Sequence, residues 1–166
     1  MATALFISRT DLVKNTILDG NLDSDKFLQF LKISQEIHIQ NYLGSKLYNR
    51  ISADVIAGTL TGDYLALVND YIQPMLIHYA MMDYLPFAAF SVKNGGVFKG
   101  NSETAQTATK DEVDFLVQKE RSFAEYYTRR FVDFICFDSA KFPEYTNNTE
   151  ADVYPEKSVQ YSNIVL

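Results

Sequence analysis

The chain has 166 residues, of which 47% are hydrophobic and 22% are charged, a balance typical of one globular domain and not of an intrinsically disordered chain. It carries 15 Lys and Arg against 21 Asp and Glu, so its formal net charge is −6. The densest basic stretch is Arg129-Arg130, which argues against wrapping of a DNA duplex, since such binding needs a basic patch. An acidic surface is compatible with DNA passing beside the protein without adhesion, because like charges repel.

The single cysteine, Cys136, cannot form an intrachain disulfide. It lies among Phe134, Ile135 and Phe137, and this apolar setting predicts a buried structural thiol. The first residues lack the basic start and long apolar core of a signal peptide, so we expect a cytosolic origin. The most apolar stretch, 75–90, is shorter than the roughly 20 residues that cross a bilayer, so we expect a buried core helix there.

The first predicted element is a short helix over residues 8–15. Ser8 and Thr10 are both candidate N-caps, because their hydroxyl oxygens can accept a hydrogen bond from a free backbone N–H of the first turn. The segment Asp19-Gly20-Asn21 then has the composition of a turn, which separates this helix from the next.

The second predicted helix begins at Asp23 or Ser24 and ends at Gly44. Its polar residues recur at steps of three and four, so they share one face. Apolar residues cover the remaining circumference and predict a wide buried side. The polar positions are Asp25, Gln29, Lys32, Glu36 and Gln40, and the apolar positions are Phe27, Phe30, Leu31, Ile33 and Ile37.

A third predicted helix begins at Ser45 and ends near Gly58, and a fourth opens at Asp63. We expect a kink in the fourth helix at Pro74, because proline lacks a backbone donor and clashes with the carbonyl four residues earlier. After Pro74 the sequence is apolar on nearly every side, which predicts a central position with neighbours on several faces. The stripe of this helix consists of Leu65, Val68, Ile72, Met75, Leu76 and Tyr79.

Residues 92–109 interrupt the helical pattern. The segment Asn94-Gly95-Gly96 is a tight-turn signature, and Val97-Phe98 follows it, which predicts a Gly-containing loop or short β-hairpin. The small polar residues of 102–109 are typical of a flexible loop. An interruption of this length between two long helices is usually functional or disordered.

The fifth predicted helix spans residues 109–138. Thr109 is its N-cap, and Glu112 three positions later completes a capping box. Apolar residues occupy one face and polar residues the other, as expected for a helix that covers a core. The apolar face comprises Val113, Leu116, Val117, Phe123, Ala124, Tyr127, Phe131 and Phe134, and the polar face comprises Asp114, Gln118, Arg121, Glu125 and Arg129.

After Lys141 the helical pattern stops, and Pro143 and Pro155 lead us to expect no further helix. These elements together predict an all-α bundle of about five helices with a long central helix. They divide the chain into a helical domain, 1–142, and an extended C-terminal tail, 143–166.

The tail ends on an apolar tip. Tyr161 begins a segment that can form a short strand and that finishes with Ile164-Val165-Leu166. An apolar tip frays on a free monomer. We therefore expect a neighbouring subunit or another partner to receive it.

Few groups suited to catalysis are present. His38 and His78 each lie on a predicted helix with neither a carboxylate nor a second histidine three or four residues on, so neither forms a local metal-binding pair. Asp83 is a candidate for a carboxylate with a raised pKa in an apolar helix, although a hydrogen bond to a tyrosine of another helix is the simpler interpretation. The cluster Lys119-Glu120-Arg121 is either a solvated face or an intersubunit salt bridge. No nucleotide-binding, metalloprotease or hydrolase motif occurs, so we expect no catalytic, cofactor or metal site.

Several blocks nevertheless follow one another in a distinctive order. They are Phe27–Glu36, Ile39–Tyr48, Tyr71–Leu76, Asn94–Phe98 and Tyr126–Arg130. The second block, which reads IQ-x-x-LG-x-K-L-Y, is the most telling. Over roughly residues 5–145 this order resembles the head–tail connector (adaptor, or head-completion) proteins of tailed bacteriophages, especially those of crAss-like phages.

The resemblance implies a structural virion protein that forms a ring, typically of twelve copies, docked below the portal at the head–tail junction. Such a ring extends the DNA channel toward the tail, and DNA crosses its lumen without sequence-specific binding. It also implies contacts with the portal and with tail or neck proteins, synthesis in the host bacterial cytoplasm, and neither enzymatic activity nor a cofactor nor a membrane.

Three interpretations remain open from the sequence. In a structural assembly protein, the loop Asn94–Phe98 and the segment from Tyr154 to Leu166 would bind the portal or adjacent subunits. In a small helical ligand-binding domain or enzyme, His78 and Asp83 would act within the bundle core. A cytosolic helical adaptor unrelated to phages is the third.

Overall fold

The computed structural model describes residues 4–15, 24–88, 90–93, 96–99, 108–149 and 152–159. Its elements are α1 (Arg9–Asn15), α2 (Ser24–Ser34), the π-helical turn η1 (Gln35–Ile39), α3 (Gln40–Ala57), α4 (Gly62–Leu67), the π-helical turn η2 (Val68–Ile72), α5 (Gln73–Tyr84), the 3-10 turn η3 (Leu85–Phe87), β1 (Phe90–Lys93), β2 (Gly96–Lys99), α6 (Lys110–Phe137), the 3-10 turn η4 (Ser139–Lys141) and α7 (Pro143–Thr146). The predicted helical bundle is confirmed, and so is the short hairpin, since β1 and β2 pair antiparallel between the last two long helices.

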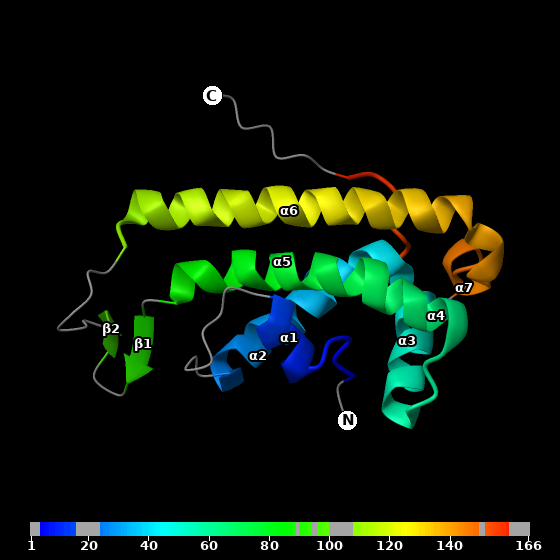
Figure 1. Cartoon of the computed structure of the whole chain (residues 1–166), viewed down its shortest axis with the longest axis horizontal. Helices are drawn as coiled ribbons and strands as arrows, with labels where there is room; N and C mark the ends of the chain where they lie inside the picture. Colours follow the sequence, from blue (N-terminus) through cyan, green and yellow to red (C-terminus); the bar gives the residue numbers. More distant parts are fainter. Residues whose placement is uncertain are drawn as a thin grey trace.

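Helix α5 is the centre of the molecule. Figure 1 shows α6 along one side of α5 and α2 along the other, with the hairpin and α3 at opposite ends. Side chains around most of the circumference of α5 are buried, which confirms the central position predicted from its apolar sequence. They are Met75, Leu76, Ile77, Tyr79, Ala80, Met81 and Tyr84.

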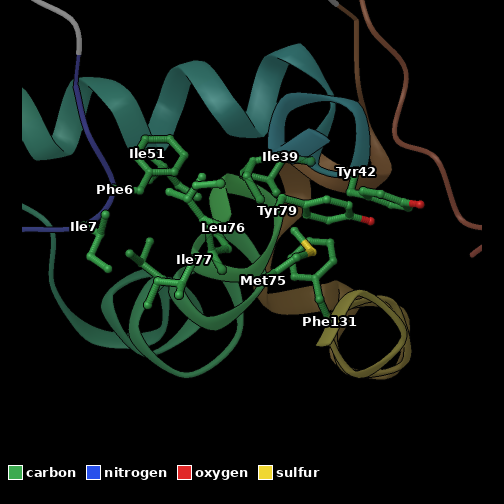
Figure 2. Close-up of a cluster of buried hydrophobic side chains, with 14 of the residues drawn as sticks. Phe6, Ile7, Ile39, Tyr42, Ile51, Met75, Leu76, Ile77, Tyr79 and Phe131 are labelled. Atoms are coloured by element: carbon green, nitrogen blue, oxygen red, sulfur yellow. The ribbon is translucent and has the colours of Figure 1, made fainter. Parts of the chain in front are cut away.

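The core forms where these side chains meet the neighbouring elements. In Figure 2, Met75 of α5 lies beside Phe131 of α6, while Leu76 and Ile77 point toward Phe6 and the N-terminal segment. Full burial of one such side chain stabilises the fold by about 1.5–3 kcal/mol. The core therefore holds α5 against elements from both ends of the chain.

The irregularity expected at Pro74 takes the form of a π-helical turn. Pro74 lies in the first turn of α5, directly after η2, and the Gln73 amide donates to the Val68 carbonyl five residues back. A wider turn at this place accommodates a ring that would clash with the carbonyl of a regular helix.

The caps agree with the predicted helix starts. The Ser8 hydroxyl accepts a hydrogen bond from the Asp11 amide at 3.1 Å. At the start of α6 the Thr109 hydroxyl accepts from the Glu112 amide at 3.3 Å, and the Thr109 amide donates to the Glu112 carboxylate at 2.8 Å, which completes the capping box. These bonds satisfy amide groups that a helix start leaves without intrahelical partners.

The prediction that Cys136 is buried is wrong, because its side chain is exposed. Its predecessor Ile135 is fully buried and its successor Phe137 is 88% exposed. Consecutive residues of a helix point about 100° apart, so one apolar neighbour does not predict the environment of the next residue.

The prediction of no helix after Lys141 is also wrong. Pro143 begins the short helix α7, in which the Asn147 amide donates to the Pro143 carbonyl at 2.9 Å. Proline is well tolerated in the first turn of a helix, where its missing N–H has no intrahelical partner to lose.

Some side chains assigned to buried faces are exposed. Ile33 and Ile37 were expected on the buried side of the second helix, and Leu116 and Phe123 on the buried face of the fifth, yet all four are exposed. Leu65 of the predicted stripe is exposed as well. The helical period assigns an apolar residue to a face without showing whether another element covers that face.

Among the described residues, no single helix is long and apolar enough to cross a membrane. One pair of helical stretches, Lys26–Ala57 and Gly62–Phe87, reaches that length and composition together, but it is bent by 102°.

Candidate functional site

A break in α3 at Gly44 creates a docking place for the C-terminal segment. Gly44 has φ 73° and ψ 156°, so the helical hydrogen-bond pattern is interrupted there. In a regular helix the Ser45 amide would donate to the Asn41 carbonyl. Here the Ser45 amide donates to the Val153 carbonyl and the Asn41 carbonyl accepts from the Glu156 amide, both at 2.9 Å. The C-terminal segment thus replaces one hydrogen bond of the helix.

Side chains around the break hold the same segment. The buried Ser45 hydroxyl donates to the Asp152 carboxylate at 2.9 Å and accepts from the Val153 amide at 3.0 Å. The Gln40 amide group also donates to Asp152, at 3.3 Å. We call Gln40, Asn41, Gly44, Ser45 and Lys46, together with residues 147–149 and 152–156, the tail clamp.

Lys46 binds the start of the C-terminal segment, at residues 147–149. Its ammonium donates to the Asn147 carbonyl at 2.8 Å and to the Thr149 hydroxyl at 3.1 Å. The Asn148 amide group donates to the Val153 carbonyl at 2.8 Å, which closes the loop between the two anchored parts. The charged side chains of Lys46 and Asp152 and the backbone of α3 therefore all hold the C-terminal segment on the bundle.

The predicted partner-binding residues fall in separate places. Tyr154 lies between the anchored Val153 and Pro155, and its side chain is 69% exposed. Gly96, Val97 and Phe98 belong to β2, where they pair with Lys93, Val92 and Ser91, and Figure 1 shows this hairpin at the other end of the molecule from α3. Asn94, Gly95, Tyr161, Ile164, Val165 and Leu166 lie outside the described residues. The division into domain 1–142 and tail 143–166 stays a prediction.

Sequence reasoning missed an exposed aromatic face on α6, which lies away from the fully buried side chains of this helix, although Phe123 at its edge contacts the His78 ring at 5.3 Å between centroids. We call it the outer stripe, and its residues are Phe115, Lys119, Phe123, Tyr126, Arg130, Asp133 and Phe137. Their steps of three and four place them on one side of the helix. Phe115 is 58%, Tyr126 60% and Phe137 88% exposed. The spacing of these residues at steps of three and four along this second face was the sequence signal that could have predicted it.

A second exposed apolar surface, the α2 patch, lies on the other side of α5. It consists of Ile33 and Ile37, one turn apart, and of Phe87, whose ring contacts that of Phe30 at 5.4 Å between centroids. Ile33 belongs to α2, Ile37 to η1 and Phe87 to η3, whereas the outer stripe belongs to α6, and Figure 1 shows α2 and α6 on different sides of α5.

Comparison with protein families decides to which group the chain belongs. Residues 39–155 match the model described as Family of unknown function (DUF6712). The chain is a member of the DUF6712 family. No curated protein and no solved structure matches it significantly. The DUF6712 match begins beside Gln40 and ends at Pro155, so it contains every residue of the tail clamp except Glu156.

The histidines of this DUF6712 protein connect helices. The His78 Nδ1 lies 2.7 Å from a Glu120 carboxylate oxygen, which joins α5 to α6, and the His78 ring stacks on Tyr127. The His38 Nε2 lies 3.3 Å from the Asp83 carboxylate, and the His38 ring stacks on Tyr79. His78 and Asp83, the pair considered for a catalytic or ligand-binding role, thus have different partners.

Asp83 has a lowered pKa, so the prediction of a raised value is wrong. Burial acts to raise the pKa of Asp83, but hydrogen bonds from His38 and Ser34, with the positive charges of His38 and Arg121, outweigh burial. The Ser34 hydroxyl donates at 2.5 Å, so the interhelical partners are a serine and a histidine, where a tyrosine was expected.

A pocket of about 200 Å³ adjoins His78. Amide side chains contribute much of its lining, and one of them, Gln73, donates to the Phe6 carbonyl at 2.9 Å. The lining residues are Asn15, Asn69, Gln73, Pro74, Ile77, His78 and Tyr127. Among the described residues, no three His, Cys, Asp or Glu side chains are placed to hold a metal ion.

Proposed function

We propose that this chain is a structural subunit of the head–tail junction of a tailed bacteriophage. Copies of it, typically twelve, form a ring between the portal and the tail and extend the DNA channel. The resemblance of the block Ile39–Tyr48 and its neighbours to connector proteins motivates this function.

The observation that carries the proposal is the exposure of large apolar side chains on both helices that flank α5. Contiguous exposed apolar surface is rare on monomeric proteins and marks interaction sites. The outer stripe belongs to α6 and the α2 patch to α2, η1 and η3, so one chain offers two separate apolar surfaces and can contact two neighbours at once. Contacts between different surfaces of identical chains close into rings when the rotation allows it.

The tail clamp gives the C-terminal residues a defined starting point. Pro155 packs against Gly44, and the Glu156 amide is bonded to α3, so the chain leaves the bundle from a fixed position. The residues from Tyr161 to Leu166 then bind the portal or an adjacent subunit. Anchoring at residues 152–156 fixes part of the segment before it binds and so reduces the entropy lost on binding.

The net charge of −6 supports the expected relation to DNA. An acidic lumen repels phosphates and lets the genome pass. In this function the protein contacts the portal, tail or neck proteins and further copies of itself, and it performs no chemical step.

Removal of Tyr161–Leu166 tests the proposal. We expect the shortened chain to lose ring formation or attachment to the portal, because the partner surface then has no apolar tip to bind. Electron microscopy and co-sedimentation with the portal measure attachment, and circular dichroism should show unchanged helicity.

A matched pair of full-length variants separates the apolar tip from chain length. Changing Ile164, Val165 and Leu166 to serine should reproduce the loss, whereas Ser162→Ala with Asn163→Ala should not. Assembly of the shortened chain at the wild-type level would remove the proposed role of this segment.

A further inference from the structure

The outer stripe of α6 has nearly the same pattern in both directions from Tyr126. Phe115 and Phe137 are equally far from Tyr126 along the chain, one before it and one after it. Lys119 and Asp133 are likewise equidistant, and they carry opposite charges. A surface that contacts its own copy across a two-fold axis must be complementary to itself, and equidistant residues of opposite charge meet this requirement.

The charged members of the stripe are available at the surface. The Lys119 side chain is exposed, with its ammonium 5.5 Å from the Phe115 ring centroid. The Asp133 side chain is 73% exposed, and its carboxylate lies 3.8 Å from the Nε of Arg129, one turn earlier in α6. An exposed pair at this distance contributes little, so Asp133 can bind another cation at small cost.

We propose that the free chain forms a two-fold dimer in which the α6 helices of two copies pack antiparallel along the outer stripe, centred on Tyr126. This dimer goes beyond the proposed function and does not rest on it. Phe115 of each copy then packs on Phe137 of the other, and Lys119 of each faces Asp133 of the other.

Charge selects the antiparallel arrangement over the parallel one. In a parallel pair Lys119 would face Lys119 and Asp133 would face Asp133, and opposed like charges disfavour an interface. The antiparallel pair forms two Lys119–Asp133 contacts and sets Phe123 near Arg130, whose guanidinium already lies 5.1 Å from the Tyr71 ring centroid of its own chain. Arginine over an aromatic ring is favourable.

The contact is large enough for a specific dimer. From Phe115 to Phe137 the stripe runs for roughly 33 Å at the rise of an α-helix. Eight aromatic side chains, four from each copy, together with the alkyl stems of Lys119 and Arg130, bury an area on the order of 1,000 Å², the size that specific interfaces need.

Charge reversal tests the pairing. Lys119→Asp and Asp133→Lys each place like charges opposite one another, and each should weaken the dimer at least tenfold. The double variant restores opposite charges and should return the dissociation constant to within about threefold of the wild type. Analytical ultracentrifugation measures the constant, and circular dichroism checks that α6 is intact.

Asp114→Lys is the matched control, because Asp114 is exposed on another face of α6 and its reversal changes the net charge as much as Asp133→Lys does. It should leave the dimer unchanged. A wild-type chain that stays monomeric at high concentration, single reversals without effect, or a double variant that fails to recover would each overturn the proposal.

The single cysteine provides an independent distance. A spin label on the exposed Cys136 of each copy should give a separation of roughly 30 Å in the antiparallel dimer, because each label lies about 15 Å from Tyr126, toward opposite ends of the helix pair. A separation below about 20 Å would indicate parallel helices and would contradict the proposal, as would the absence of a defined distance.

Discussion

At the scale of single residues, Gly44 determines how the C-terminal segment meets α3. Its φ of 73° and ψ of 156° lie in a region that only glycine occupies readily. A Cβ atom at this position would lie 2.6 Å from both Cδ and Cγ of Pro155, closer than atoms pack. Both the backbone break and the close approach of Pro155 therefore require glycine.

Substitution of Gly44 tests the tail clamp, with Gly58 as the control. Gly58 ends α3 with φ 67°, and nothing lies within 4 Å of a Cβ built there, so Gly58→Ala adds backbone strain alone, about 1–2 kcal/mol. Gly44→Ala adds the clash with Pro155 and should cost at least about 1 kcal/mol more. Urea denaturation measures both.

Limited proteolysis locates the effect. Gly44→Ala should expose residues 147–159 to cleavage, whereas Gly58→Ala should not. Equal losses of stability and equal cleavage patterns in the two variants would show that Pro155 does not depend on Gly44.

At the scale of elements, polar groups join α5 to the helices on either side. Asp83 binds Ser34 and His38, and His78 binds Glu120 of α6. Hydrogen bonds to a charged partner contribute about 1.5–3 kcal/mol in favourable cases, and they fix the relative register of packed helices.

Asp83→Asn tests the link between α5 and the α2–η1 helix. The pKa of Asp83 is lower in the folded chain than in the unfolded chain. The carboxylate therefore stabilises the fold above the unfolded pKa, and this contribution is lost as pH falls through the folded pKa. The variant should be about 1–2 kcal/mol less stable than the wild type at pH 7, and the difference should shrink toward pH 3.

Urea denaturation at both pH values measures this difference. Asp70→Asn is the control, because Asp70 is exposed on η2. The free energy of unfolding of this variant should stay within about 0.5 kcal/mol of the wild-type value. A deficit in Asp83→Asn that is constant between pH 7 and pH 3 would show that ionisation of Asp83 does not matter.

The elements themselves could be predicted from local chemistry. Apolar periodicity located the long helices, the Thr109 and Glu112 pair located the start of α6, and Gly58 located the end of α3. These signals act over a few residues, so they are visible in one sequence. Gly44 was likewise identified as a helix end, although the chain resumes as a helix at once.

The site could be predicted only in part. Tyr154 was expected at a partner surface and is exposed, but the bonds from Ser45 to Val153 join residues far apart in sequence, which periodicity does not reveal. The outer stripe was not predicted from the sequence, because Phe123 was assigned to the buried face of the helix, whereas its side chain is exposed. The sequence of a helix with apolar residues on two faces shows that both faces are apolar. It does not show which of the two faces the core covers.

At the scale of the whole molecule, the arrangement of surfaces is suited to assembly. The outer stripe and the α2 patch flank the central α5, and the tail clamp fixes the start of the C-terminal residues. A two-fold contact through the outer stripe closes at two copies and does not propagate. Such a dimer would hold the aromatic stripe out of water until a subunit joins the proposed ring.

Immunogold electron microscopy of tailed phage particles purified from infected cells that make this chain tests the proposed function most directly. With an antibody to the chain, gold should gather at the junction between head and tail, at one position per particle. Label spread over the capsid or the tail fibres, or particles that carry none of the chain although the infected cells make it, would contradict a connector role.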